Sequence, residues 1–314
     1  MRAWAMTATP PQTAPAPRAA LEAGVIVPFV VVVLIWSSSW YVIKDQVGLA
    51  PLGWTVVARF AIAAAAMGLL ALVRGESLRL APAGLRVAAL VGLTQFCLNF
   101  QFVYRAEVSL TSGVMALMMA LMTIPTALLA RAIFKTPLDR RFVAGSAVAL
   151  GGIGLLLLNE YRAAPPSAMV GAGLAYGTAA LLAAAVAGVV QLSRAAREAA
   201  LVPMLFWAMT IGTVLDIGFA LADSGLPPAA VPARFWGGAV YLGIVCSVVP
   251  FPLYFGLIRR IGAGRATYTN VAIPVLAMGI STVLEDYRWT ALAVAGVDLA
   301  MIGLVVVMGS RRIQ

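Results

Sequence analysis

The side chains that could bind a solute are polar groups set inside long apolar runs. Gln95, Asn99 and Phe102 recur at i, i+4 and i+7, so they share one face of a helix. Each amide offers both a donor and an acceptor, which suits a zwitterion or a sugar. The alternative is that the two amides only bond neighbouring helices. We expect Gln95 and Asn99 to bind substrate.

Three consecutive serines, Ser37 to Ser39, follow Trp36. They cannot share one helix face, and serines in helices often bond the carbonyl groups of the preceding turn. In the functional interpretation, Ser38 or Ser39 faces a solute while Trp36 stacks on it. A stripe of methionines, including Met118 and Met122, could adapt to differently shaped apolar ligands or simply pack.

The second half of the chain holds further candidates for substrate contacts. They are Tyr176, Gln191, Tyr254, Tyr268 and Asn270. Three prolines are candidate hinges or gates, because proline removes a backbone hydrogen bond, although proline is also common in membrane helices. They are Pro125, Pro274 and Pro250.

Two charged residues inside the apolar runs leave several interpretations open. Arg59 could pair with a carboxylate, hold a helix carbonyl or bind the carboxylate of a substrate. Asp298 could be a proton site, because a buried carboxyl with a raised pKa can cycle near neutral pH. It could also make a structural hydrogen bond.

Composition says what must position these side chains. The 314 residues are 62% hydrophobic and 11% charged, with no histidine and two cysteines, and the mean hydropathy is +0.96. Soluble domains carry roughly 25% charged residues. Apolar runs of about 20 residues predict an all-α integral membrane protein. With no histidine and no cysteine cluster, we expect no metal and no cofactor, and we expect the two cysteines to be packing residues.

Ten membrane spans are predicted, separated by short connections. They are 24–43, 51–73, 84–104, 109–132, 139–158, 167–191, 199–222, 234–257, 264–284 and 289–308. Residues 1–23, rich in alanine and proline, predict a disordered tail before a retained first span.

The distribution of positive charge predicts the orientation. With the N-terminus in the cytoplasm, sixteen Lys and Arg residues fall in inside segments and five in outside loops, with Arg59 in a span. This bias predicts cytoplasmic termini in a bacterial-type inner membrane. The net charge of +10 therefore reflects the membrane topology, with positive residues placed near anionic lipid. Nucleic acid is not an expected partner.

The two halves of the chain are copies of one unit. Cys97 and Cys246, like Pro125 and Pro274, are 149 positions apart. Five spans per copy is an odd number, so the second copy must be inverted, and matching loops indeed carry opposite charge. Inverted repeats are typical of alternating-access carriers, which bind substrate near the midplane between the halves.

The first span also carries a family resemblance. Its stretch from Leu34 to Lys44, LIWSSSWYVIK, resembles the opening signature of EamA-type proteins of the drug/metabolite transporter superfamily, with Ser37, Ser39 and Trp40 as departures from the common Gly, Asn and Phe. Arg59-Phe60 and the two proline segments fit the same pattern. The resemblance covers residues 24–308 and implies ten helices in two inverted five-helix repeats around a central cavity. Among such families the chain is most similar to the YddG-type exporters of aromatic and other amino acids.

These observations give a domain plan and a function to test. We expect a cytoplasmic tail (1–23), repeats at 24–158 and 167–308, a linker (159–166) and a second tail (309–314). The expected function is export of small amphipathic metabolites, aromatic and other amino acids foremost, and a monomer is possible. The alternatives are a proton-coupled multidrug antiporter using Asp298 and, less favoured, a membrane-embedded enzyme.

Overall fold

A computed structural model describes residues 23–135, 138–163, 168–261, 266 and 268–309. The predicted tails, apart from Ala23 and Gly309, and the end of the predicted linker lie outside the described residues. Residues 159–163 of that linker continue the preceding helix.

Helices dominate the described residues, which contain no strand, and two of the helices include π-helical segments. The first half contains α1 (Ala23–Gln46), α2 (Leu52–Val73), α3 (Pro82–Val91), η2 (Gly92–Asn99), α4 (Phe100–Ala106), α5 (Ser112–Ala120), α6 (Thr123–Phe134) and α7 (Arg140–Ala163). The second half contains α8 (Ala168–Gln191), α9 (Arg194–Glu198), α10 (Leu201–Ser224), α11 (Ala233–Val240), η3 (Tyr241–Val245), α12 (Pro250–Ile261), α14 (Thr269–Leu284) and α15 (Ala291–Met308).

The described helices confirm the predicted membrane architecture. Nine helical stretches among the described residues are long and apolar enough to cross a membrane, and the remaining predicted span, 264–284, contains the shorter apolar helix α14. Each stretch falls within a few residues of a predicted span.

The two repeats run in opposite senses. The first helix of the first repeat, α1, begins at the end of the bundle where Arg260 of α12 bonds the Gly24 carbonyl. The first helix of the second repeat, α8, begins at the other end, where Gly173 lies against Ser109. We call these the terminal end, which also holds the end of α15, and the opposite end. Equivalent helices therefore cross the bundle in reverse directions, as an inverted duplication requires.

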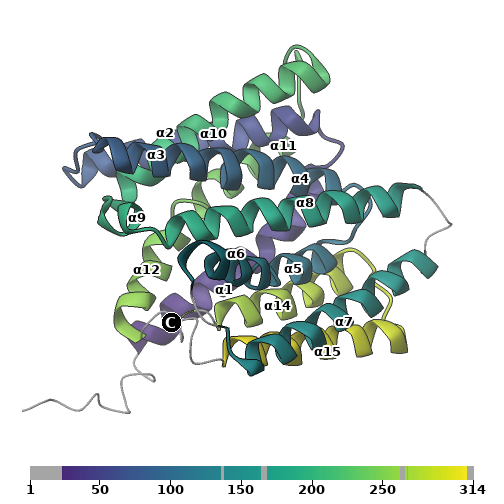
Figure 1. Cartoon of the computed structure of the whole chain (residues 1–314). Helices are drawn as coiled ribbons and strands as arrows, with labels where there is room; N and C mark the ends of the chain where they lie inside the picture. Colours follow the sequence, from purple (N-terminus) through teal and green to yellow (C-terminus); the bar gives the residue numbers. More distant parts are fainter. Residues whose placement is uncertain (1–22, 136–137, 164–167, 262–265, 267, 310–314) are drawn as a thin grey trace, which may run out of the picture.

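The last helices of the two repeats pair with each other (Figure 1). Glycines let their backbones approach: a Cβ on Gly152 of α7 would lie 2.2 Å from the Ala300 nitrogen of α15. Small residues at such contacts stabilise helix pairs in membranes by allowing close van der Waals packing. The α7–α15 pair makes few contacts with the other helices, so it lies at the periphery of the bundle.

The two π-helical segments interrupt equivalent helices. The segment η2 joins α3 to α4 in the first repeat, and η3 follows α11 in the second. Gly92 and Tyr241, their first residues, are separated by the same 149 positions as the two cysteines. Both segments lie beside the cavity described next.

The three predicted hinge prolines differ in their local structure. Pro125 lies in the first turn of α6, just after the break that separates α5 from α6. Pro250 is the first residue of α12, where its missing N–H costs no helical bond. Pro274 lies inside α14, which continues through it. Two of the three therefore mark interruptions.

Candidate functional site

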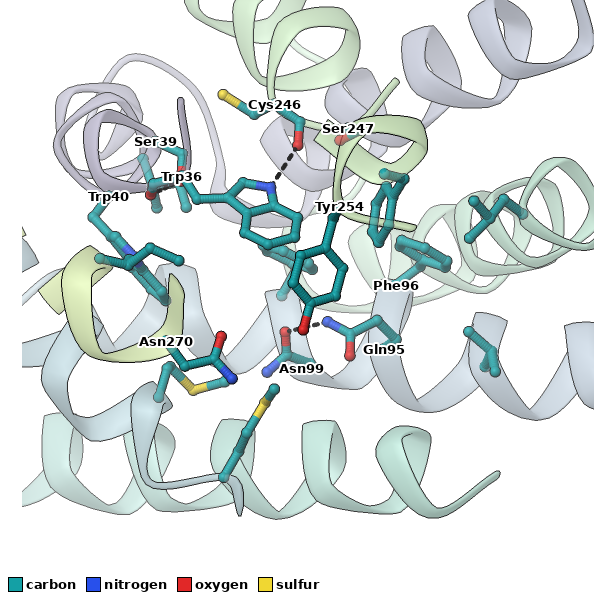
Figure 2. Close-up of a pocket in the computed structure, with 18 of the residues that line it drawn as sticks. Trp36, Ser39, Trp40, Gln95, Phe96, Asn99, Cys246, Ser247, Tyr254 and Asn270 are labelled. Carbon is teal, nitrogen blue, oxygen red and sulfur yellow. Dashed lines mark hydrogen bonds between the residues drawn. The ribbon is translucent and has the colours of Figure 1, made fainter. Parts of the chain in front are cut away.

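A cavity of about 320 Å³ lies between the two repeats. Its described walls come from α1, α2, η2 and α5 of the first repeat and from α10, α12 and α14 of the second. Figure 2 shows Trp36, Tyr254, Gln95, Asn99 and Asn270 gathered around a common space. Gln191 and Leu201, at the terminal ends of α8 and α10, also contribute, so the cavity extends toward the terminal end.

An indole ring forms the centre of one wall. Trp36 lies with its ring centroid 5.5 Å from that of Tyr254 and 5.9 Å from that of Phe251. Its Nε1–H donates a 3.2 Å hydrogen bond to the Cys246 carbonyl, next to η3 (Figure 2). That carbonyl is available because the helix is interrupted between η3 and α12. The bond orients the indole and leaves its faces to aromatic neighbours.

A second aromatic group lies on α2, η2 and α4. The ring of Phe60 packs edge-on against Phe96 and Phe100, at centroid distances of 5.2 and 4.9 Å. The guanidinium of Arg59 lies 4.2 Å from the Phe100 centroid and 5.1 Å from that of Phe60. All four residues line the cavity. The wall is therefore aromatic with one cation.

The two amides predicted from their spacing form a chain of hydrogen bonds. Gln95 Nε2 donates to Asn99 Oδ1 at 3.2 Å, and Asn99 Nδ2 donates to the Ala180 carbonyl of α8 at 2.8 Å. Asn99 is buried, whereas Gln95 is half-buried. Asn99 thus holds the Gln95 amide in place, and both amides line the cavity.

The three serines of α1 take three different partners. Ser37 Oγ donates to the Ile273 carbonyl of α14 at 3.1 Å, which links the two repeats. The hydroxyl of Ser38 lies 2.7 Å from that of Tyr241. Ser39 lines the cavity and donates to the Trp36 carbonyl at 2.7 Å. Only Ser39 therefore faces a solute-sized space.

Most of the predicted substrate-binding residues meet at this cavity. Those that line it are Trp36, Ser39, Arg59, Gln95, Asn99, Met122, Gln191, Tyr254 and Asn270, together with Pro274. Those that do not are Ser38, Met118, Tyr176 and Tyr268, together with Pro125, Pro250 and Asp298.

The residues away from the cavity have other surroundings. Met118 packs against Gly177 of α8. Tyr176 stacks on Phe102 at 6.2 Å beside a smaller recess that Arg105 lines. Tyr268 is 46% exposed.

Sequence reasoning missed the phenylalanines that build the aromatic wall. Phe60, Phe96, Phe100 and Phe251 line the cavity. Phenylalanine is so common in membrane helices that its identity carries no signal for a site. Their spacing could have indicated the site, since Phe96 and Phe100 are about one helical turn apart and lie on either side of the predicted amide Asn99.

At the opposite end, a lysine joins helix termini. Lys44 Nζ, near the end of α1, donates to the Leu110 carbonyl at 2.9 Å and also to the Glu107 carbonyl. The next residues of the turn begin α5, where the Ser112 backbone N–H donates to the Glu285 carboxylate at 3.1 Å. The ends of α1, α4, α5 and α14 are thereby joined.

Glu107 is a buried carboxyl at this junction. Its side chain is 0% exposed, and neither carboxylate oxygen has a hydrogen-bond partner among the described residues. Burial raises the pKa of Glu107 well above its usual range, the nearby Glu285 raises it further, and Lys44 opposes the rise. Sequence reasoning assigned this residue to a polar break and missed its burial.

The described residues give less support to a proton site at Asp298 or to a metal site. Asp298 is exposed on α15, which contributes none of the described cavity residues. Among the residues that the structure describes, no three His, Cys, Asp or Glu side chains gather to hold a metal. Cys97 and Cys246 are buried free thiols. The site offers binding groups, and its central cation and amides are suited to recognising a polar group on an apolar solute.

Comparison with known proteins agrees with this arrangement. A family model described as the EamA-like transporter family matches residues 24–158 and 171–309. A crystal structure of another protein is similar over 93% of this chain and 99% of its own, with a TM-score of 0.64 and 18% identity. At that identity the likeness shows the fold alone. A comparison with curated proteins gives no match.

Proposed function

The chain belongs to the EamA-like transporter family, and we propose that it is a carrier that exports small amphipathic metabolites, aromatic and other amino acids foremost. Solute would bind between the inverted repeats, and rocking of one repeat against the other would expose it to each side in turn. The charge bias of the loops supports an inner-membrane orientation with both termini in the cytoplasm.

One observation carries this proposal: the cavity between the repeats joins aromatic walls to an amide. Trp36 and Phe251 supply apolar surface, and Gln95 supplies a polar group with a fixed position. Ligand sites are typically apolar hollows of about 300–1,000 Å³ with a few placed polar groups. The cavity meets this description and suits a small solute with one apolar and one polar part.

The ends of the bundle support alternating access. The cavity extends toward the terminal end, while Lys44 and Ser112 join helix ends at the opposite end. Such an arrangement is expected of a carrier open on one side and closed on the other. The proton-antiport alternative is weakened because its candidate, Asp298, is exposed on the peripheral helix pair.

A counterflow assay tests the proposed function. Liposomes containing the purified protein and loaded with unlabelled phenylalanine should accumulate external labelled phenylalanine, whereas protein-free liposomes should not. A panel of sugars and cationic drugs should compete weakly. Trp36→Leu should reduce the exchange, and Trp236→Leu, at a residue 51% exposed on α11, should not. Exchange of drugs or sugars without amino acids would refute the proposed substrate class.

A further inference from the structure

Arg59 is a buried cation that lies near the Tyr104 hydroxyl but has no carboxylate partner in the described part of the chain. It is 4% exposed, and its Nε and Nη1 have no hydrogen-bond partner. By contrast, Arg105, in the last turn of α4, contacts Asp223 at 3.0 Å and donates a hydrogen bond to the Gln101 side chain. Arginine in membrane spans is normally paired or marks a substrate path. The unpaired state of Arg59 is therefore the feature to explain.

Aromatic rings cover the faces of the Arg59 guanidinium, whereas its Nε and Nη1 have no acceptor among the described residues. Phe100 lies over the guanidinium at 4.2 Å and Phe60 at 5.1 Å, and both contacts are cation–π interactions. Such contacts leave the N–H groups, which point along the edges of the plane, without acceptors. A buried cation with unpaired donors is costly unless an anion and its oxygens complete the site.

The cavity supplies the place for that anion. Arg59 is the one charged side chain among the described residues that line it. The remaining groups are apolar, aromatic or neutral amides and hydroxyls, so nothing described there offsets the positive charge. A planar guanidinium matches a carboxylate with two parallel N–H···O bonds.

We infer that Arg59 binds the carboxylate of the transported solute, so that the cavity selects apolar or aromatic carboxylates over their neutral and cationic analogues. The inference rests on the proposed function, because it assigns the cavity to a solute. It adds that the solute carries a negative charge and that Arg59 is the residue that recognises this charge. The ammonium group of an amino acid would then meet neutral acceptors, such as the Gln95 carbonyl, rather than an acid.

Equilibrium binding to the purified protein tests the inference without transport. Tryptophan fluorescence can follow it, because Trp36 and Trp40 line the cavity. The probes are 3-phenylpropionate, its neutral amide and phenethylamine, which share a phenyl group and differ in charge. We expect the carboxylate to bind at least about 10-fold more tightly than the amide, since hydrogen bonds between charged groups are the strong ones. The amine should bind most weakly.

Two substitutions at Arg59 and one elsewhere complete the design. Arg59→Gln should abolish the preference for the carboxylate, and Arg59→Lys should restore it in part, because lysine keeps the charge but not the planar fork. Arg105→Gln removes the same charge from an arginine paired with Asp223, and it should leave the preference unchanged. Gel filtration and thermal unfolding check that each variant is folded.

The outcomes separate the inference from the proposed function. Equal binding of the carboxylate and the amide by the folded wild type would overturn the inference, as would a preference that survives Arg59→Gln. A preference for the carboxylate without counterflow of any solute would refute the proposed function but would still support an anion site at Arg59. Should Arg59→Gln fail to fold, the three-probe series on the wild type and on Arg59→Lys still decides the question.

Discussion

Ser112 at the start of α5 donates to the carboxylate of Glu285 at the end of α14, with a backbone N–H bond of 3.1 Å and a second bond from its hydroxyl. The two residues belong to different repeats and are 173 positions apart. This contact joins the repeats at the opposite end of the bundle, where it also satisfies an otherwise unpaired N–H at a helix N-terminus.

Replacing Glu285 should loosen this junction. Glu285→Gln keeps the shape but removes the charge, and hydrogen bonds to a charged group contribute about 1.5–3 kcal/mol. We expect thermal unfolding in detergent to begin at a lower temperature, with Ser112→Ala adding little in the double variant. Additive effects in that double-mutant cycle would show that the two side chains do not act together.

Glu107 predicts a dependence of stability on pH. Burial raises the pKa of Glu107 above the ordinary 4.5, so the folded chain holds this proton to higher pH than the unfolded chain. Stability present at low pH is then lost as the pH rises from about 4.5 toward the raised value, at about 1.4 kcal/mol per pH unit. Lys44, which faces Glu107 from α1, opposes the loss, and Glu285 adds to it.

The neutral isostere should remove this contribution. The unfolding temperature of Glu107→Gln should exceed that of the wild type by a margin that grows with pH. Glu198→Gln, at a carboxylate 62% exposed beside Arg194, should show no such trend. A margin independent of pH would mean that Glu107 is ionised in the folded chain.

The amide pair predicts an ordered set of transport defects. Gln95→Leu should raise the concentration needed for half-maximal exchange, because the Gln95 amide lines the cavity. Asn99→Leu should do the same and also lower the unfolding temperature, because Asn99 bonds both Gln95 and the Ala180 carbonyl. Leu93→Ala, at a residue 38% exposed on the same segment, is the control. If Leu93→Ala impaired exchange as much as Gln95→Leu and Asn99→Leu do, the two amides would only contribute to packing.

The α7–α15 contact predicts different outcomes at neighbouring glycines. Gly152→Ala places a methyl group 2.2 Å from the Ala300 nitrogen, where only backbone movement can relieve the clash. We expect a loss of about 1–3 kcal/mol, seen as a lower unfolding temperature. A Cβ on Gly151 meets nothing within 4 Å, so Gly151→Ala should be neutral or stabilising. Equal effects would contradict the close approach.

Asp298 gives a test of proton coupling. It is exposed on the peripheral helix α15, away from the cavity. Asp298→Asn should therefore keep most of the phenylalanine counterflow in liposomes. Loss of substrate-driven flux in a folded Asp298→Asn protein would favour the proton antiporter.

The span pattern and the inverted repeat were predictable, because both follow from features that act over many residues. Apolar runs must cross the membrane, and the 149-residue offset relates the halves without knowledge of their packing. The Gln95–Asn99 pair was predictable for a local reason, since i, i+4 side chains share a helix face.

Other parts of the site depend on contacts between helices and could not be predicted. Consecutive serines point about 100° apart, so the sequence could not decide whether Ser38 or Ser39 meets the cavity. The pKa of Glu107 depends on its burial and on the charges of Lys44 and Glu285, which lie far from it in the sequence. Spacing along one helix carries no information on such neighbours.

The π-helical segments give equivalent helices of the two repeats a common property. Each holds one residue more than an α-helix of the same rise would contain, as the bond from the Cys246 N–H to the Tyr241 carbonyl shows. If that surplus residue moved along the helix, the side chains it passed would turn by about 100° while most backbone bonds stayed paired. At η2, which contributes Gln95, Phe96 and Asn99 to the lining, such a shift in register would exchange cavity residues without unfolding the span.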